Sequence, residues 1–176
     1  MEHLAVKIAE YSKKTPQKTA ITHRGRAISY SEFEKEANKI ANYLYDRVKE
    51  NKNVALLLDR SPELIESVVG LLKCGFVFAP VDPDYPQGRI EKYLKIAGAE
   101  WIITSTGYYE KFRDIIDRQG FKVLLIDKAG GAGSLPANVF VPEDEAADEL
   151  RFAPVYNNHC YIIFTSGSLG VPKGIL

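Results

Sequence analysis

The sequence has little cysteine, no net charge and no long hydrophobic run. Cys74 and Cys160 are its only cysteines and lie far apart in apolar surroundings, which argues against a disulfide framework or a structural metal site. Lysine and arginine total 23, as do aspartate and glutamate, so there is no overall field to attract nucleic acid or an anionic membrane. No run of ~18 apolar residues and no signal-peptide pattern is present. We therefore expect a cytoplasmic protein that binds neither nucleic acid nor membranes.

The composition is that of one folded domain. Of the 176 residues, 45% are hydrophobic and 26% are charged, which is ordinary for a globular protein and unlike a disordered one. The one stretch of biased composition, AGGAGS at 129–134, is interpreted as a surface loop. His3, His23 and His159 share no metal-ligand spacing, so we predict no metal site. A single domain over residues 1–176 is expected.

Short, almost wholly apolar runs predict buried strands. A half-exposed antiparallel strand would alternate apolar and polar residues, whereas a parallel strand covered on both faces does not. Segments of helical period lie between most of these runs, and this alternation predicts an α/β fold with a mostly parallel sheet, flanking helices and right-handed crossovers. The expected strands are Val54–Leu58, Phe76–Val81, Trp101–Thr104, Val123–Asp127 and Tyr161–Phe164.

Helices are predicted where apolar residues recur every three to four positions. The clearest runs from Ser31 to Val48, and Ser31 with Glu34 has the spacing of a capping box. Ser61 is a candidate N-cap for the next helix, with Pro62 at its first position, and that helix should stop near Gly75. Other expected elements are helices at Leu4–Lys13, Arg89–Ala97 and Tyr108–Arg118, and a hairpin of Thr19–Thr22 with Ala27–Ser29 around Arg24-Gly25.

The segment from Pro136 to His159 differs from the rest of the chain. It is polar, contains prolines at positions 136, 142 and 154, and carries an acidic run at Glu143–Glu149. We interpret it as a long connection, with the acidic run on a solvated face.

The last sixteen residues, YIIFTSGSLGVPKGIL, are the most informative, because an apolar strand leads directly into a loop of hydroxyls and glycines. Glycines let successive backbone N–H groups turn toward one anion, hydroxyls add donors without bulk, and a lysine supplies a mobile charge. In open α/β sheets ligands bind at the carboxyl ends of strands, where this loop should lie. The candidate phosphate-binding residues are Thr165, Ser166, Gly167, Ser168, Gly170, Lys173 and Gly174.

The loop matches neither common phosphate signature. A Walker loop requires G-x-x-x-x-G-K followed by Ser or Thr, whereas here Pro172 precedes Lys173 and Gly174 follows it. The dinucleotide pattern G-x-G-x-x-G is also absent. From composition alone, a flexible turn with an incidental lysine stays an equal alternative.

The string TSGSLGVPKG at 165–174 resembles the third core motif of adenylate-forming enzymes, a family of amino-acid adenylation domains, acyl-CoA synthetases and luciferases. It departs at Leu169, where the family usually has a hydroxylic residue, and so lacks one potential phosphate donor. Two earlier stretches are similar to the first and second core motifs: ISYSEFEKEANKIANYL at 28–44 and LLKCGFVFAPVDPDYPQGRI at 71–90. The form of the second is characteristic of amino-acid-activating domains. Taken by themselves, these two stretches are interpreted as structural.

The resemblance implies the N-terminal portion of an adenylation domain of nonribosomal peptide synthesis, within the large domain of the enzyme. Such domains join an amino-acid carboxylate to the α-phosphate of ATP, release pyrophosphate, and pass the acyl group to a phosphopantetheine thiol on a carrier protein. The loop at 165–174 would bind the β- and γ-phosphates, with Lys173 as a mobile lid on the pyrophosphate. Mg²⁺ would accompany the nucleotide.

In this family the residues that recognise adenine, ribose and amino acid follow the third motif. We therefore assign no catalytic residue to this chain and expect it to be inactive alone, with the remainder of the adenylation domain supplied by the same chain or another. The small C-terminal domain is also not expected here. Two alternatives stay open: a non-catalytic binding module that keeps this fold, and part of an acyl-CoA synthetase.

Overall fold

The apolar runs of the sequence form the centre of the fold. The computed structural model describes residues 4–127, 135–142, 147–165 and 173–175, and within them a sheet of five parallel strands has the order β4-β3-β5-β6-β7. The predicted α/β fold with a parallel sheet is confirmed. The short strand β7 was not predicted, because two residues inside a polar segment give no periodic signal. The strands are β3 (Asn53–Leu57), β4 (Val77–Val81), β5 (Trp101–Thr104), β6 (Lys122–Leu125) and β7 (Val139–Phe140).

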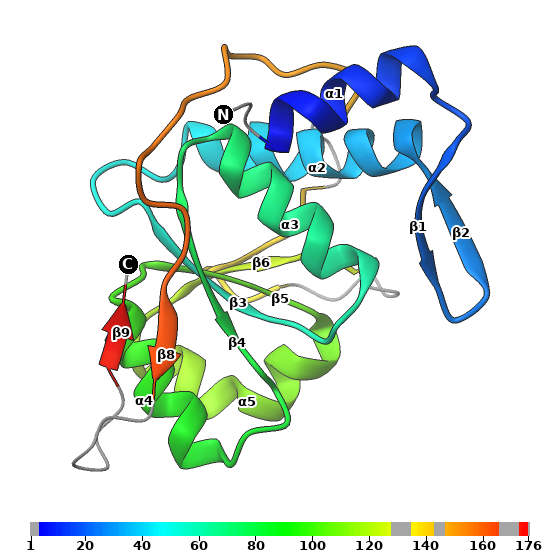
Figure 1. Ribbon diagram of the computed structural model, residues 1–176. Coiled ribbons are helices and arrows are strands. Elements are labelled where there is room, and N and C mark those ends of the chain that lie inside the picture. The colour runs from blue at the N-terminus through cyan, green and yellow to red at the C-terminus, as the bar shows by residue number, and fades with distance from the viewer. Residues whose placement is uncertain (1–3, 128–134, 143–146, 166–172, 176) are drawn as a thin grey trace.

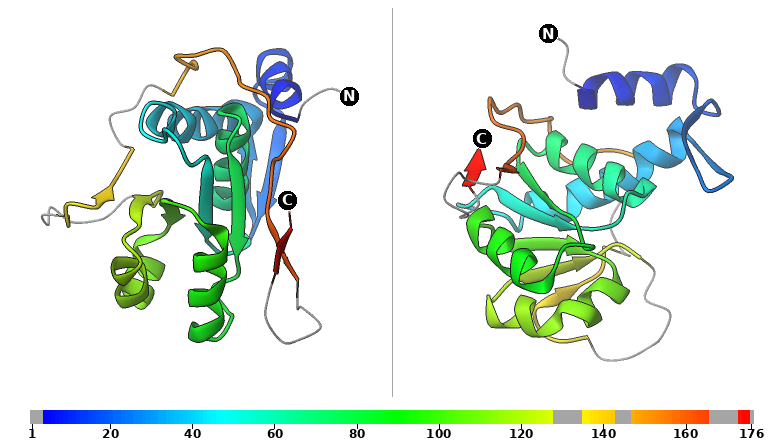
Figure 2. Two further views of the ribbon diagram at one scale, coloured as in Figure 1. Left: turned by 90° about the vertical axis from the view of Figure 1, so that its left-hand side faces the viewer. Right: turned by 60° about the horizontal axis from the view of Figure 1, so that its bottom comes forward.

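Helices cover both faces of this sheet (Figures 1 and 2). On one face lie α2 (Tyr30–Tyr45) and α3 (Pro62–Lys73), with α1 (Leu4–Lys14) packed outside them. On the other face lie α4 (Gln87–Ala97) and α5 (Thr106–Arg118). No helix in the described part of the chain is long and apolar enough to cross a membrane.

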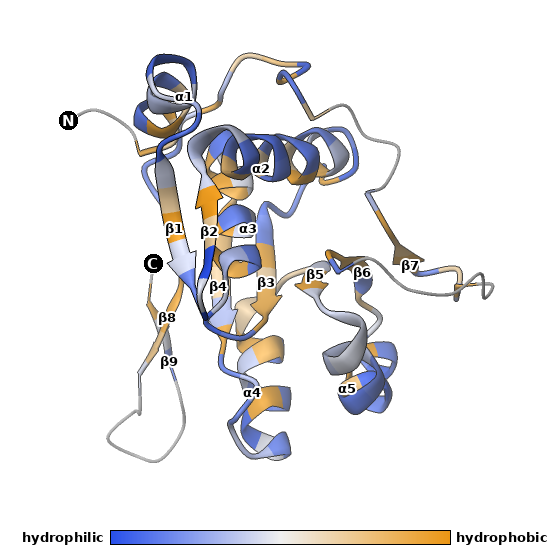
Figure 3. Ribbon diagram, turned by 90° about the vertical axis from the view of Figure 1, so that its right-hand side faces the viewer, coloured by the Kyte–Doolittle hydropathy of each residue, from blue (hydrophilic) through white to orange (hydrophobic). Residues whose placement is uncertain are grey.

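The two covered faces explain why the strands do not alternate in polarity. Ala55 and Leu57 of β3 pack into the core beneath α4 and α5, whereas Val54 and Leu56 pack into the core beneath α2 and α3. All four are fully buried. Successive strand side chains point to opposite faces, so a strand with cover on both sides must be apolar at every position. In Figure 3 the hydrophobic colour follows β3 and β5 between the helical layers.

The N-cap of the long helix α2 lies two residues before the predicted one. Ser29 is its N-cap: the Ser29 hydroxyl accepts from the Glu32 N–H at 3.2 Å, and the Glu32 carboxylate accepts from the Ser29 N–H at 2.8 Å. The predicted box of Ser31 and Glu34 is therefore wrong. Ser29 is extended because it ends strand β2 (Arg26–Ser29), which leads directly into the helix. Glu34 instead forms an ion pair with Lys73 of α3.

The N-terminal hairpin and the other helices follow the predictions closely. Strand β1 (Thr19–His23) pairs with β2 around Arg24 and Gly25, which both have positive φ, as a tight hairpin turn requires. Helix α3 has Ser61 as N-cap, although its side chain makes no capping hydrogen bond. Helix α4 ends at Gly98 in the left-handed region.

The predicted last strand, Tyr161–Phe164, does not join the parallel sheet as expected. Its first residues follow the open edge of β4, where the Ile162 N–H donates to the Phe78 carbonyl at 2.9 Å and Tyr161 forms an isolated bridge. Backbone groups alternate in direction along a strand, so Pro80 is the next β4 residue to face this edge, and it has no N–H to offer. The chain then leaves β4: β8 (Ile163–Thr165) pairs with β9 (Lys173–Ile175) as an antiparallel hairpin.

A buried ion pair joins α2 to α3. The Lys73 side chain is 1% exposed, and its Nζ donates to Glu34 Oε1 at 2.5 Å and to Asn38 Oδ1 at 2.6 Å. The other Glu34 oxygen is buried with no hydrogen-bond partner among the described residues. Burial lowers the pKa of Lys73, and the Glu34 carboxylate acts in the opposite direction. Removing one partner therefore leaves an uncompensated buried charge.

We predict that Lys73→Met will lower the free energy of unfolding by about 3–5 kcal/mol, because the Glu34 carboxylate loses its partner in a low-dielectric place. The double variant with Glu34→Leu should recover most of this loss. Urea unfolding followed by the fluorescence of Trp101, the single tryptophan, measures both. Lys35→Met is the control, since Lys35 pairs with Asp148 at 2.8 Å on the exposed surface; an equal loss in that variant would contradict the prediction.

A second ionisable side chain is buried on α3. Glu66 is 7% exposed, and burial together with the nearby Glu63 and Glu36 carboxylates raises the pKa of Glu66 from 4.5 to about 8, although Arg26 and Lys39 lower it. The folded protein thus keeps a proton that the unfolded chain releases between these values. The stability from this proton is fully present below about pH 4.5 and is lost as the pH rises toward 8.

We predict that the free energy of unfolding will fall between about pH 5 and pH 8 by on the order of a few kcal/mol. Glu66→Gln should abolish most of this slope, because its neutral amide has no proton to lose. The control is Glu110→Gln, since this carboxylate is 60% exposed on α5 and takes no part in the pKa shift of Glu66, and it should keep the slope. Urea unfolding curves across this pH range measure the slope for each variant. An unchanged slope in Glu66→Gln would show that Glu66 is not its source.

Candidate functional site

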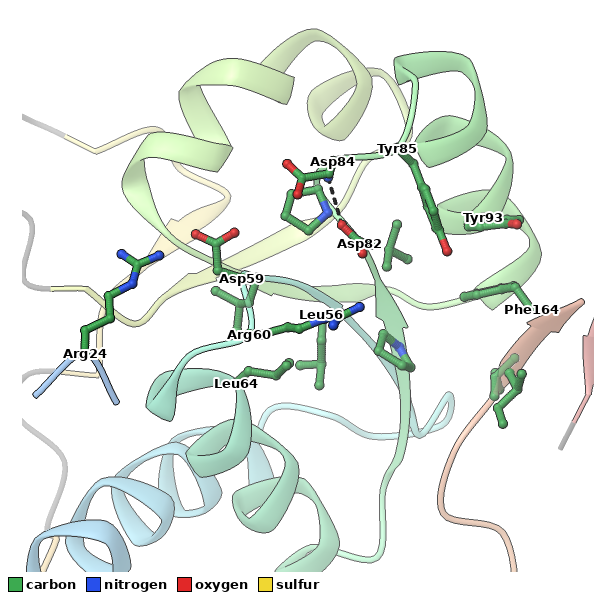
Figure 4. A pocket seen from close by; sticks show the side chains of 16 residues that line it. Arg24, Leu56, Asp59, Arg60, Leu64, Asp82, Asp84, Tyr85, Tyr93 and Phe164 are labelled. Carbon is green, nitrogen blue, oxygen red and sulfur yellow. Dashed lines mark hydrogen bonds between the residues drawn. The ribbon is translucent and has the colours of Figure 1, made fainter. Parts of the chain in front are cut away.

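The carboxyl ends of β3 and β4 open into a cavity of about 550 Å³ (Figure 4). One side is charged and carries Arg24 from the β1–β2 turn with Asp59 and Arg60 from the end of β3. The opposite side is aromatic, with Tyr93 from α4 and Phe164 from β8. The cavity therefore lies where the sequence predicts ligands to bind, at the carboxyl edge of the sheet.

The charged side is rich in carboxylates. The Tyr108 hydroxyl donates to Asp59 Oδ1 at 2.6 Å, and this bond, burial, and the charges of Asp59, Asp84 and Asp82 raise the pKa of Tyr108 to about 12. The Asp84 N–H donates to Asp82 Oδ1 at 2.9 Å, which holds the turn after β4. No group of three or more His, Cys, Asp or Glu side chains in the described ranges could hold a metal ion. The three carboxylates outnumber the guanidinium groups of Arg24 and Arg60, so this side has an excess of negative charge, which does not favour phosphate.

A second anion site could be expected at the start of α5, which follows β5. There the Thr106 N–H donates to both Asp127 oxygens, at 2.8 and 2.9 Å, and its hydroxyl donates to Oδ1 at 3.0 Å. Ser105 also caps the helix by accepting from the Tyr108 N–H. The donors at this helix start are thus occupied by an internal carboxylate, and the loop after β8 is left as the candidate.

The structure places three of the predicted phosphate residues together. Thr165 and Lys173 are partners on the last rung of the β8–β9 hairpin, and Gly174 lies opposite Phe164 on the rung before it. All three predicted residues are exposed. Ser166, Gly167, Ser168 and Gly170 lie outside the described residues, as does Leu169.

The aromatic side connects the second sequence motif to this hairpin. The Tyr93 and Phe164 rings are stacked with centroids 4.5 Å apart and planes 6° apart, and Tyr85 meets Tyr93 edge-on at 5.6 Å. The sequence reading missed Tyr93 as a site residue. Its signal is the apolar stripe of α4, in which Ile90, Tyr93, Leu94 and Ala97 are all buried.

A long connection carries the chain from β7 back across the α2/α3 side to β4, as the orange segment of Figure 1 shows. We call residues 147–160 the strap. Asn42 of α2 holds it twice: its amide donates to the Glu149 carbonyl at 2.9 Å and its side-chain oxygen accepts from the Arg151 N–H at 3.0 Å. The long connection predicted for Pro136 to His159 is interrupted by β7 and holds for the strap, whose anchors were missed. Their signal is a pair of asparagines at helical spacing, Asn38 and Asn42, on a buried face.

The strap continues over the end of α3. The Val155 N–H donates to the Lys73 carbonyl at 2.9 Å, and the Asn157 amide donates to the Gly75 carbonyl at 3.2 Å. Gly75 has φ +68°, and a Cβ there would lie 2.8 Å from the Val155 side chain. Glycine is therefore required twice at this position, for its backbone conformation and for the close approach of the strap.

The sheet, the loop position and the three ordered motifs define the adenylate-forming class. The family model described as AMP-binding enzyme matches residues 8–176, and the chain belongs to this family. It is similar to nonribosomal peptide synthetases: it is 33% identical over 168 residues to bacitracin synthase 3 of Bacillus licheniformis and 33% identical over 168 residues to surfactin synthase subunit 1 of Bacillus subtilis. These matches cover 95% of this chain but only 2% and 4% of those proteins.

Solved structures agree with this assignment. The N-terminal subdomain of NpsA from Klebsiella oxytoca, in complex with 3-hydroxyanthranilyl-AMSN, superposes with a TM-score of 0.71 at 25% identity, over 100% of this chain and 40% of that one. The nonribosomal peptide synthetase FmoA3 in its AMPPNP-bound form shares the fold, with a TM-score of 0.72 at 24% identity over 98% of this chain and 17% of that one. The chain thus corresponds to the N-terminal part of an adenylation domain.

We predict that Gly75→Ala will loosen the strap, because the new methyl group meets Val155 and the left-handed backbone is strained. Trypsin should then cleave after Arg151 about tenfold faster, since this cleavage follows local opening. Gly98→Ala is a matched control: Gly98 has φ +59°, but nothing lies within 4 Å of its added Cβ. If both variants are cleaved at the same rate, the close approach is not what holds the strap.

Proposed function

We propose that this chain supplies the phosphate-binding part of an adenylation domain that activates an amino acid with ATP for nonribosomal peptide synthesis. The observation that carries this is the Thr165–Lys173 rung, which closes the β8–β9 hairpin beside the carboxyl-edge cavity in a member of the AMP-binding family. A hydroxyl donor and an ammonium at the two ends of one loop suit an anion. AMPPNP bound to the structural neighbour FmoA3 supports the nucleotide.

The chemical difficulty of adenylation is the approach of one anion to another. The amino-acid carboxylate must attack the α-phosphate while pyrophosphate leaves with growing charge. Lys173 is exposed, so its ammonium can follow the β- and γ-phosphates. Mg²⁺ would enter with the nucleotide, held by its phosphates rather than by a cluster of carboxylates on this chain.

The exposed face of the hairpin supports a partner for this chain. Ile163 and Ile175 face each other across the hairpin and are 48% and 54% exposed, and Tyr161 beside them is 43% exposed. Such an apolar face is suited to the remainder of the adenylation domain, in the same polypeptide or another. The remaining proposed partners are the amino acid and the phosphopantetheine thiol of a carrier protein. Cys74 and Cys160 are free thiols, which suits a reducing cytoplasm.

We predict that Lys173→Ala will slow adenylation in a polypeptide where this chain is continued by the adenine- and carboxylate-binding parts. Turnover in amino-acid-dependent exchange between pyrophosphate and ATP should fall roughly a hundredfold to a thousandfold, about 2.7–4 kcal/mol, because the cation acts where charge develops. The amino-acid KM should change little. Lys173→Arg should recover little, since a planar guanidinium does not replace a compact ammonium.

The control is Lys52→Ala, because Lys52 is exposed at the opposite, amino end of the sheet. It should retain wild-type turnover. Wild-type turnover in Lys173→Ala would remove the phosphate role from this loop. A continued polypeptide that binds partners but shows no exchange with any amino acid would favour the non-catalytic module instead.

A further inference from the structure

The hairpin that carries the phosphate loop rests on one helix. Figure 1 shows β8 and β9 beside α4, and the closest packing involves the rung of Phe164 and Gly174. This rung comes immediately before the Thr165–Lys173 rung at which the loop begins and ends. Contacts that fix the Phe164–Gly174 rung therefore fix the position of Thr165 and Lys173 at the two ends of the loop.

On the β8 side, the contact is an aromatic stack. Tyr93 is 7% exposed and lies nearly parallel to Phe164, and Tyr85 packs edge-on against Tyr93 (Figure 4). A parallel stack fixes both the height and the rotation of the Phe164 ring over the helix, and aromatic pairs are stronger than their buried area alone implies.

On the β9 side, the contact is a close approach of backbone to side chain. A Cβ added to Gly174 would lie 3.1 Å from Ile96 Cγ2 and 3.0 Å from Ile162 Cγ2. A side chain at this position would crowd both isoleucines and force them or the strand to shift. Tyr93 and Ile96 are three residues apart, so they lie on the same face of the helix.

The following proposal rests on the proposed function and on these contacts. We propose that α4 positions the phosphate loop: Tyr93 and Ile96 clamp the Phe164–Gly174 rung and thereby set the direction of Thr165 and Lys173. Side chains alternate along a strand, so turning Phe164 toward α4 turns Thr165 and Lys173 to the opposite face. That face is the one on which Ile163 and Ile175 are exposed. Tyr93 is a positioning residue and has no part in the chemistry.

The test compares three variants of the chain. Tyr93→Ala removes the stack, Tyr93→Phe keeps it, and Tyr43→Ala removes an aromatic side chain of equal burial that packs on Trp101 and Phe140 instead. Two quantities are measured under conditions in which every variant is folded. The first is amide hydrogen exchange in residues 163–165 and 173–175, and the second is the affinity for inorganic pyrophosphate by calorimetry.

We expect Tyr93→Ala to raise exchange in the hairpin, and to weaken pyrophosphate binding, by about tenfold each, the factor that one aromatic pair of ordinary strength supplies. Exchange in β3 should rise less than exchange in the hairpin, because Tyr93 also packs in the core with Ala55 and Leu57 and its loss acts on β3 only through global stability. Tyr93→Phe should match the wild type within about twofold, because ring stacking does not need the hydroxyl. Tyr43→Ala should leave the hairpin unchanged even though it lowers global stability.

Wild-type exchange in the hairpin of Tyr93→Ala would overturn the proposal, as would an equal effect of Tyr43→Ala. Should Tyr93→Ala fail to fold, Gly174→Ala tests the same clamp from the other strand, since its methyl group must push β9 away from Ile96; unchanged exchange there would equally overturn it. A wild-type chain that binds no pyrophosphate would count against the proposed function, while the exchange rates would still decide whether α4 holds the hairpin.

Discussion

All five strands of the central sheet run in the same direction, and the remaining structure follows from this constraint. Each strand must be followed by a crossover that returns the chain to the starting edge, and the crossover helices cover both faces. The carboxyl ends then meet at one edge, which brings together Asp59 after β3, Asp82 after β4, Ser105 after β5 and Asp127 after β6. Polar residues that are remote in sequence become neighbours at this edge, because both faces of the sheet are buried and only the strand ends reach solvent.

The open edge of β4 explains why the chain leaves the sheet at β8. Phe78 still pairs with the incoming chain at Cys160 and Ile162, but Pro80 offers no N–H to the next residues. The chain therefore turns away and pairs with itself as the β8–β9 hairpin. A strand that continued along β4 would hold its backbone N–H groups in the ladder of the sheet, whereas the β8–β9 hairpin lies beside the sheet and pairs only with itself.

The three sequence motifs are linked to one another by contacts in the structure. The first motif provides the capping box of α2, the Glu34 partner of Lys73 and the Asn42 anchor of the strap. The second provides Lys73 itself and Gly75, over which the strap passes. Its downstream helix α4 then packs under the hairpin that bears the third. These contacts support a structural reading of the first two motifs, since they join the elements that carry the third; the second motif also lines the cavity with Asp82 and Tyr85.

Local pattern was sufficient for the strands β3 to β6, the helices and the β1–β2 hairpin, because burial on both faces and helical period leave their mark on neighbouring residues. It missed β7 and assigned Tyr161–Phe164 to the parallel sheet. It also singled out the loop from Thr165 to Gly174 through its glycines and hydroxyls. It placed the capping box at Ser31 instead of Ser29, since both spacings are present and only the path of β2 chooses between them. The tertiary structure alone decided that Asn42 holds the strap, that Pro80 ends the pairing with β4, and that Tyr93 stacks on Phe164. Each of these joins residues far apart in the chain, and no local period records which distant surface a buried side chain will meet.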